Sequence, residues 1–316
     1  MSIGVVIPAY KSADTLARTI NSCLPHVNPH DIIVVFDGPD PKAEQIAQDA
    51  SDKIRIVVME AQSGAPVCRN EGLALTETEY VMFMDADDYV EGPLLELGSS
   101  TGRRENADVV LSPFCFEMPD GSRQVFYPHG RYGALDRRTI VSRWLAGDYT
   151  PPCAVIWRTE YVREIGGWDE YLAKNQDGDL MYRAVMLGAR VSTSAHGLGV
   201  YVQSDDPRRI TRSNTRNTLA SQLAVLERVR ADLPNLDNAP EEELAQAYYG
   251  LARLAYDGGV DEIGRLAERI ARSLGLEGQP GTRGHEMLAT VLGLRRKQRL
   301  IKFVRRSVGA LAGHPA

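Results

Sequence analysis

Four short apolar runs, separated by segments with helical periodicity, constrain the fold of this 316-residue chain more than any other feature. Each run has the length of a strand and no polar face, as expected of strands that are buried on both sides of a sheet. The predicted strands cover Ile3 to Pro8, Asp31 to Phe36, Ile54 to Met59 and Tyr80 to Met84. The predicted helices between them cover residues 12–24, with Ser12 as N-cap, 42–50 and 65–75. Strands that alternate with helices form a mostly parallel sheet with right-handed crossovers, so the sequence predicts an α/β domain.

The fourth apolar run leads directly into three carboxylates, those of Asp85, Asp87 and Asp88. Ligands of open α/β sheets bind at the carboxyl ends of the strands, where these acids are placed. Asp85 and Asp87 are two residues apart and would point to the same side of an extended backbone. Two such carboxylates repel unless a cation lies between them, and Mg²⁺ or Mn²⁺ bridges carboxylates to substrate phosphates. The pattern predicts a site for a metal and a nucleotide diphosphate, and the alternative is an acidic turn after a core strand.

Other polar and aromatic residues follow neighbouring predicted strands. Tyr10 comes after the first strand, Asp37 follows the second, and Arg69 lies in the helix before the fourth. An aromatic ring can stack on a base, a carboxylate can accept a hydrogen bond from a base, and an arginine can bind phosphates. Each of these residues alone would be an ordinary packed tyrosine, turn residue or solvated helix charge, so the prediction rests on their convergence.

Four segments of the N-terminal half together resemble the family 2 glycosyltransferases of the GT-A fold. They read Val-Val-Ile-Pro-Ala-Tyr (5–10), Val-Val-Phe-Asp-Gly (34–38), Ser-Gly-Ala-Pro-Val-Cys-Arg-Asn-Glu-Gly-Leu (63–73) and Phe-Met-Asp-Ala-Asp-Asp (83–88). The resemblance implies a GT-A, Rossmann-like nucleotide-sugar-binding domain in which Asp37 contacts the base, and Asp85 and Asp87 serve the sugar nucleotide and its metal. The second motif commonly carries two acids in the family, and Phe36 replaces the first of them, so only Asp37 is carried over.

The resemblance and the strand ends together give one set of predicted donor-site residues. The predicted contacts to the nucleotide sugar are Pro8, Ala9, Tyr10, Asp37, Arg69, Asp85, Ala86 and Asp87. Of these, Asp85 and Asp87 are the predicted metal ligands. The predicted cofactors are Mn²⁺ or Mg²⁺ and a nucleotide-sugar donor, which the resemblance implies to be a UDP-sugar.

The resemblance continues into residues 151–191, where the family has its catalytic base. Gln176-Asp177 matches a Glu-Asp pair that opens a helix in the family, and the aspartate of that pair is the base. The predicted helix has one buried face and ends at a glycine, with Leu180, Ala184, Leu187 and Gly188 in these positions. Asp177 is therefore the predicted base and Asp179 is the alternative, while Gly178 departs from the aromatic residue that the family often has between its acids.

The chemistry of glycosyl transfer explains why these residue types are needed. A divalent metal neutralises the leaving diphosphate, and one positioned carboxylate deprotonates the acceptor hydroxyl. A single base opposite the leaving group gives direct displacement with inversion, which the family resemblance also implies. The predicted function is an inverting, metal-dependent hexosyltransferase that acts on a glycan or lipid-linked acceptor, in bacterial surface polysaccharide or glycolipid synthesis. One alternative is a nucleotidyltransferase, which would need a Gly-rich phosphate loop that residues 8–12 do not supply. The other is a non-catalytic sugar-nucleotide-binding or scaffold protein.

From residue 214 onward the chain becomes rich in Leu, Ala, Arg and Glu. We predict a GT-A glycosyltransferase domain over residues 1–212 and an α-helical C-terminal subdomain over 213–316. The predicted helices of this subdomain cover residues 216–232, 241–256, 260–274 and 284–311. The last of them ends in a basic amphipathic segment, residues 294–311, with Leu294, Leu300, Ile301, Val304, Val308 and Leu311 on its apolar side. Such a helix either lies on an anionic membrane surface or packs on its own domain with a basic outer face, and both interpretations stay open.

Composition and charge limit the partners and the location. The net charge is −6 although residues 295–306 carry seven positive charges and no acid, so the body of the chain is acidic and nucleic acid is not an expected partner. No apolar run is long enough to span a bilayer, and no secretory signal is visible. The four cysteines lack paired spacing and indicate reduced, buried thiols. We expect a cytoplasmic protein, with peripheral contact at the inner face of the membrane if residues 294–311 bind lipid.

Overall fold

The computed structural model describes residues 3–128, 135–204 and 213–311, with side chains described as far as residue 304. The chain forms two compact units. The first unit comprises Met1–Ile140, Tyr149–Tyr171 and Gln176–Asp206, and the second comprises Val141–Asp148, Leu172–Asn175 and Pro207–Ala316. The predicted domain boundary after residue 212 borders on residues 205–212, which lie outside the described residues.

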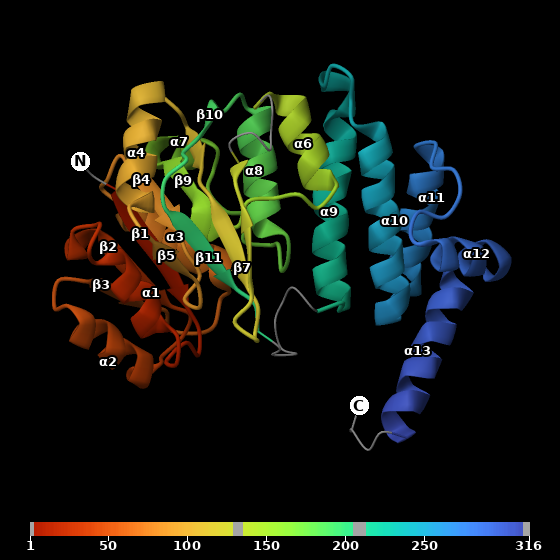
Figure 1. Cartoon of the computed structure of the whole chain (residues 1–316), viewed down its shortest axis with the longest axis horizontal. Helices are drawn as coiled ribbons and strands as arrows, with labels where there is room; N and C mark the ends of the chain where they lie inside the picture. The colour runs from red at the N-terminus through yellow and green to blue at the C-terminus, as the bar shows by residue number, and fades with distance from the viewer. Residues whose placement is uncertain (1–2, 129–134, 205–212, 312–316) are drawn as a thin grey trace. The chain divides into compact units, whose positions relative to one another are not determined.

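A seven-stranded mixed sheet forms the centre of the first unit (Figure 1). Its strands, in order across the sheet, are β10 (Val191–Thr193), β6 (Val109–Leu111), β9 (Val155–Arg158), β4 (Tyr80–Phe83), β1 (Ile3–Ala9), β2 (Ile32–Phe36) and β3 (Arg55–Val58). Strands β4, β1, β2 and β3 are parallel, β10 is parallel to β6, and β9 is antiparallel to both of its neighbours. The predicted mostly parallel α/β sheet is confirmed, and its four predicted strands are all present.

A second, four-stranded sheet of the first unit was not predicted. Its strands, in order, are β5 (Tyr89–Glu91), β11 (Leu198–Val202), β7 (Phe114–Glu117) and β8 (Arg123–Phe126). Strand β11 is antiparallel to β5 and parallel to β7, and β7 is antiparallel to β8. Since β5 begins directly after Asp88, this sheet starts at the acidic segment that follows β4.

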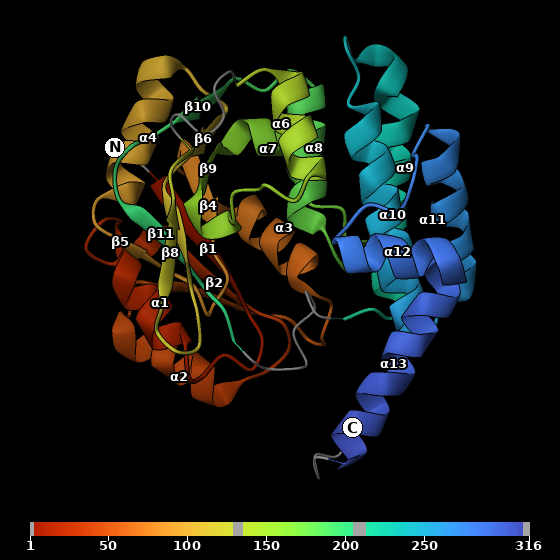
Figure 2. The same ribbon diagram turned by 45° about the vertical axis from the view of Figure 1, so that its right-hand side comes forward.

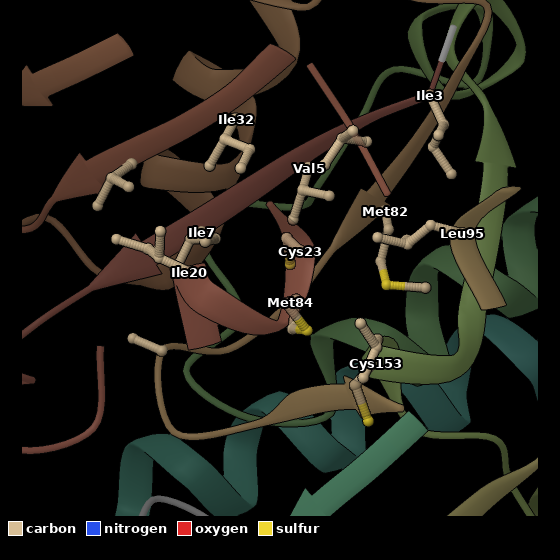
Figure 3. Close-up of a cluster of buried hydrophobic side chains, with 14 of the residues drawn as sticks. Ile3, Val5, Ile7, Ile20, Cys23, Ile32, Met82, Met84, Leu95 and Cys153 are labelled. Atoms are coloured by element: carbon tan, nitrogen blue, oxygen red, sulfur yellow. The ribbon is translucent and has the colours of Figure 1, made fainter. Parts of the chain in front are cut away.

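Helices cover both faces of the seven-stranded sheet. The helices of the first unit are α1 (Leu16–Cys23), α2 (Pro41–Ala50), α3 (Ala65–Leu75), α4 (Leu94–Glu105), α7 (Thr159–Glu164) and α8 (Gln176–Met186), and α6 (Arg137–Leu145) continues into the second unit. On one face Val5 of β1 packs in a core with Ile20 of α1 and Leu95 of α4 (Figure 3). On the other face Val6 lies in a core with Leu180 of α8, on the side of α3, α7 and α8 (Figure 2). Successive residues of β1 therefore enter opposite cores, as expected of a strand that is covered on both faces. The four cysteines, all among the described residues, are buried thiols without disulfides, as predicted.

The second unit is helical. Its remaining helices are α9 (Arg216–Asp232), α10 (Glu241–Gly258), α11 (Asp261–Ser273), α12 (Arg283–Leu292) and α13 (Leu294–Leu311), and α9, α10 and α11 pack side by side (Figures 1 and 2). The prediction of a single helix over residues 284–311 is wrong, because Gly293 adopts a φ of 76° that ends α12. Among the described residues, no helix is both long enough and apolar enough to cross a membrane.

Two local predictions about helix ends and faces are wrong. The N-cap of α1 is Thr15 and not Ser12, whose carbonyl instead accepts a hydrogen bond from the backbone N–H of Thr15. Leu187, the first residue after α8, is exposed and does not share the buried face of Leu180 and Ala184.

Candidate active site

The carboxyl ends of β1, β2 and β4 meet at one edge of the seven-stranded sheet. The last residue of β1 pairs with the last residue of β2, and β4 lies parallel on the other side of β1. Asp37 and Asp85 therefore leave the sheet at the same edge, from strands that are roughly 10 Å apart at the usual strand spacing. Pro8 and Ala9 are buried at the end of β1, and the half-exposed Tyr10 follows them. The structure thus brings these predicted donor-site residues to one edge of the sheet.

Asp37 forms one wall of a pocket of about 530 Å³ that Tyr10 and Lys11 also line. The carboxylate is almost completely buried, and its Oδ1 accepts hydrogen bonds from the backbone N–H groups of Ser63 at 2.5 Å and Gly64 at 3.0 Å. Gly64 is the N-cap of α3 and has a φ of 97°, a conformation that favours glycine. Asp37 therefore fixes the start of α3 beside the end of β2, and it shapes the pocket through this loop.

Asp85, Asp87 and Asp88 each bring a carboxylate oxygen to within 4.8 Å of the other two. They lie in a turn, in which the N–H of Asp88 donates to the carbonyl of Asp85 at 3.1 Å. The prediction that an extended backbone aligns Asp85 and Asp87 is therefore wrong, although their carboxylates do gather. Asp88 is fully buried, and its Oδ1 accepts a hydrogen bond from the N–H of Val202 at 2.9 Å. An oxygen-rich cluster of this size fits a hard divalent cation.

Side chains of helix α1 contact the backbone carbonyls of this acidic turn, and these contacts were not predicted. The Oγ1 of the buried Thr19 lies 2.9 Å from the carbonyl oxygen of Ala86 and 2.7 Å from that of Asp88. Arg18 donates to the carbonyl of Asp87 at 2.9 Å. Two consecutive helical residues therefore contact three successive carbonyls of the turn, and these contacts do not involve its carboxylates. The partners are 67 to 69 positions apart in the chain, so no local signal could have revealed the pairs.

Arg69 connects the acidic turn to α8. The buried guanidinium donates to Oδ1 of Asp85 at 2.5 Å and to Oε1 of Gln176 at 3.1 Å, and it lies over the ring of Trp168 at 4.4 Å from the ring centroid. Burial acts to lower the pKa of Arg69, but the negative charges of Asp85 and Asp177 outweigh it and raise that pKa. Arg69 therefore remains a cation between the two acids. The roles of Trp168 and Gln176 as its neighbours were not predicted.

Asp177 lies in the first turn of α8, where its Oδ1 is buried and has no hydrogen-bond partner among the described residues. Burial raises the pKa of Asp177 to about 6, against the opposing effect of Arg69 and with a further increase from Asp85. A carboxylate with a pKa near the working pH, and with an oxygen free of other hydrogen bonds, is suited to accept a proton.

Asp179, the alternative base, has a different environment. It is fully buried, and its Oδ2 accepts from Nε of Arg183 at 2.8 Å. Arg183 also donates to the carbonyls of Ile165 at 2.7 Å and Gly167 at 2.6 Å. The carboxylate of Asp179 therefore positions an arginine that fastens α8 to the turn after α7, which is a structural task.

Comparison with known proteins identifies the family. The sequence profile of glycosyl transferase family 2 matches residues 4–162. The chain belongs to this family. The matched segment of this family 2 member contains every predicted donor-site residue, whereas Asp177 lies beyond it.

Individual relatives agree with this assignment. The chain is 29% identical over 194 residues to the pre-mycofactocin glycosyltransferase of Mycobacterium tuberculosis, a match that covers 60% of this chain and 40% of the relative. It is 26% identical over 214 residues to the amylovoran biosynthesis glycosyltransferase AmsB of Erwinia amylovora, which covers 64% of this chain and 69% of the relative. The chain thus spans less than half the length of the first relative.

Solved structures share the fold of this family 2 member. Crystal structures of residues 1–349 of Staphylococcus aureus TarS, in complex with UDP and with UDP-GlcNAc, superpose with TM-scores of 0.60 and 0.59 at 18% and 15% identity. Each match covers 87% of this chain and 90% of the TarS chain. The likeness confirms the predicted GT-A-like fold with a helical C-terminal region.

Proposed function

We propose that this chain is an inverting, metal-dependent glycosyltransferase that moves a sugar from a UDP-sugar to a hydroxyl group of a glycan or lipid-linked acceptor. The observation that carries the proposal is the arrangement of Arg69 beside the acidic turn at Asp85 and within electrostatic reach of Asp177, whose Oδ1 is buried. It combines a place for a diphosphate and its metal with a candidate base in one unit. The UDP and UDP-GlcNAc complexes of TarS support a nucleotide-sugar donor for this fold.

The donor is proposed to lie along the carboxyl edge of the sheet. The pocket beside Tyr10 and Asp37 would take the base, with Tyr10 as the stacking surface, and Pro8 and Ala9 at the end of β1 would lead into it. The diphosphate would lie at the turn of Asp85, Ala86 and Asp87, with Arg69 nearby. The distance of roughly 10 Å between the ends of β2 and β4 suits a ligand that has a base at one end and a diphosphate at the other.

Asp85 and Asp87 are the residues that would hold Mn²⁺ or Mg²⁺. Their carboxylates gather with that of Asp88, which is fully buried and accepts a hydrogen bond from the N–H of Val202, whereas Asp85 and Asp87 are half-buried. The bound ion would act as a Lewis acid that stabilises the negative charge of the leaving diphosphate.

Asp177 is the proposed general base. The acceptor oxygen forms a bond to the anomeric carbon as the bond from that carbon to the diphosphate oxygen breaks, and the electron pair of the broken bond leaves with UDP. The hydroxyl proton passes to Asp177, whose buried Oδ1 has no other hydrogen-bond partner among the described residues. One displacement inverts the configuration at the anomeric carbon and needs no enzyme nucleophile.

The setting of the reaction is part of the proposal. AmsB is named for amylovoran biosynthesis, which supports a role in bacterial surface polysaccharide or glycolipid assembly. We place the protein in the cytoplasm, in peripheral contact with the inner face of the membrane through residues 294–311.

The test is hydrolysis and transfer measured with a panel of nucleotide sugars and either Mn²⁺ or Mg²⁺. We expect metal-dependent turnover of one donor, loss of turnover in Asp87→Ala, and retained donor binding without transfer in Asp177→Asn. Asp52→Asn, which changes an exposed aspartate before β3, is the matched control and should behave as the wild type. If no nucleotide sugar binds or turns over, the proposal fails and a non-catalytic role takes its place.

A further inference from the structure

The elbow formed by α12 and α13 exposes an unusual number of apolar side chains. We call Met287, Val291, Leu300, Phe303 and Val304 the elbow surface, and each of them is between 46% and 77% exposed. Leu300, Phe303 and Val304 are spaced by three and four residues and therefore lie on one face of α13. Solvent exposure of such large side chains on one helical face marks a contact surface.

The packing of α13 explains why this face points outward. Leu294, at the start of the helix, is buried, and Arg295 and Arg299 both donate to Oδ2 of Asp261 at the start of α11. Lys302 donates to the carbonyl of Asp257 at 2.9 Å. The basic side chains thus bind the helix to its own unit. Of the predicted apolar side, Leu294 is buried and Ile301 is half-buried, whereas Leu300 and Val304 are exposed.

The positive charge around the elbow surface favours an anionic bilayer over a second copy of this chain as its partner. Residues 287–316 include no Asp or Glu and seven Lys or Arg, of which Arg296 is exposed on α13. A second copy of this chain that docked through the same surface would bring like charges together, which disfavours a symmetric dimer. An anionic bilayer instead offers an apolar layer for the side chains and phosphates for the arginines.

A pocket at the same elbow is lined by three arginines, of which Arg295 and Arg299 are paired with Asp261. It has a volume of about 350 Å³, and Arg295, Arg296 and Arg299 line it. Its acid, Glu268, accepts a hydrogen bond from the hydroxyl of Tyr256. On the helical wheel of α13, Arg296 lies between Leu300 and Phe303, because residues three, four and seven apart share one face, and Arg299 lies beside Phe303.

We propose that the elbow surface docks this protein on an anionic lipid bilayer, with the apolar side chains at the acyl boundary and Arg296 at the headgroup phosphates. This deepens the membrane contact of the proposed function by naming the side chains that make it. It does not require catalytic activity, so its test is independent of the test of glycosyl transfer.

The experiment is co-sedimentation of the full chain with vesicles of neutral phosphatidylcholine, or of phosphatidylcholine mixed with anionic phosphatidylglycerol. We expect binding to the anionic vesicles alone, weakened by salt. Phe303→Ser should lower the partition coefficient about tenfold, the effect of withdrawing one large apolar side chain, and Arg296→Gln should lower it about fivefold. Leu187→Ser removes a similarly exposed apolar side chain from the first unit and should leave binding unchanged.

Three outcomes would overturn the inference. The first is a wild-type chain that does not bind anionic vesicles, and the second is equal binding by the wild type and Phe303→Ser. The third is a dimer by light scattering that Phe303→Ser converts to a monomer, because the elbow surface would then be a subunit interface. Unchanged far-UV circular dichroism of each variant would show that the helices remain folded.

Discussion

Arg69 and Asp85 form an ion pair with 2.5 Å between a guanidinium nitrogen and Oδ1, and this pair lies close enough to Asp177 for both partners to act on its pKa. Arg69 lowers the pKa of Asp177, whereas Asp85 raises it. The acid expected to serve the donor and the acid expected to deprotonate the acceptor therefore share one cation. The charge on one side of the site influences the proton affinity on the other.

The pH dependence of transfer should report the pKa of Asp177. Since the ionised carboxylate is the active form of a base, kcat/KM should rise with pH through about 6 and level off above about 7, with a fall of about tenfold per unit below 6. The measurement is the pH profile at subsaturating acceptor. A profile that is flat between pH 5 and 7 would exclude Asp177 as the titrating base.

Asp177→Asn should stabilise the protein at neutral pH. The pKa of Asp177 is about 6 in the folded state and about 3.9 in an unfolded chain, so between these values the folded state binds more protons and stability falls as pH rises. The ionised carboxylate costs about 3 kcal/mol above pH 6, and Asn removes this cost. Chemical unfolding should show the gain at pH 7.5 and almost none at pH 4.

Asp179→Asn is the matched control for that experiment, because it changes the other acid of the same helical turn. It should lower the free energy of unfolding by about 3 kcal/mol at pH 7.5, since Arg183 would lose its buried carboxylate partner. Equal losses of stability in the two variants would contradict the distinct roles of Asp177 and Asp179.

Arg69→Gln should move the pH profile to higher pH by about one unit, because the cation that favours the ionised form of Asp177 is removed. Arg69→Lys keeps the charge and should move the profile less, although it loses the planar contact with Trp168. Comparing the profile midpoints of the two variants separates charge from packing. A midpoint that stays near 6 in Arg69→Gln would show that the arginine does not act on the base.

Thr19→Val should weaken metal binding without changing any carboxylate. The variant removes the hydroxyl that contacts the carbonyls of Ala86 and Asp88, so the acidic turn loses its support from α1. We expect the metal concentration for half-maximal activity to rise about fivefold, with kcat at saturating metal little changed and a loss of about 1–2 kcal/mol in stability. Thr19→Ser keeps the hydroxyl and should resemble the wild type. An unchanged metal requirement in Thr19→Val would refute this role.

The parts of the fold that the sequence predicted are those with local physical signals. Strands β1, β2 and β4 are continuous apolar runs, and a short run of that kind is typical of a strand in the middle of a sheet that is covered on both faces. Helix α3 begins at Gly64-Ala65-Pro66, which carries its own start signal. The gathering of Asp37 and Asp85 at one edge followed from parallel strands alone, because the carboxyl ends of those strands coincide.

The missed features depend on contacts between distant parts of the chain. Strand β8 is short and largely exposed, so its residues show no apolar alternation that would predict a strand. Arg69 and Gln176 are 107 positions apart, and their hydrogen bond exists only because α3 and α8 pack on the same face of the sheet. The division of the last helix at Gly293 was missed because an isolated glycine can also be tolerated within a helix, so the residue alone does not predict a helix end.

The packing of α3 on β1 gives the last prediction, which joins the fold to the site. A Cβ atom at Gly72 would overlap the side chain of Val6, so α3 can approach the sheet this closely only with glycine at that position. Gly72→Ala should cost about 1–3 kcal/mol in stability and should lower kcat/KM, because a displaced α3 carries Arg69 away from Asp85. Gly250→Ala in α10 adds the same methyl group where no atom lies within 4 Å, and it should stabilise the protein by about 0.5–1 kcal/mol. Thermal unfolding of both variants measures the difference in stability between them. A Gly72→Ala protein as stable as the wild type would mean that the approach of α3 to β1 does not fix the position of Arg69.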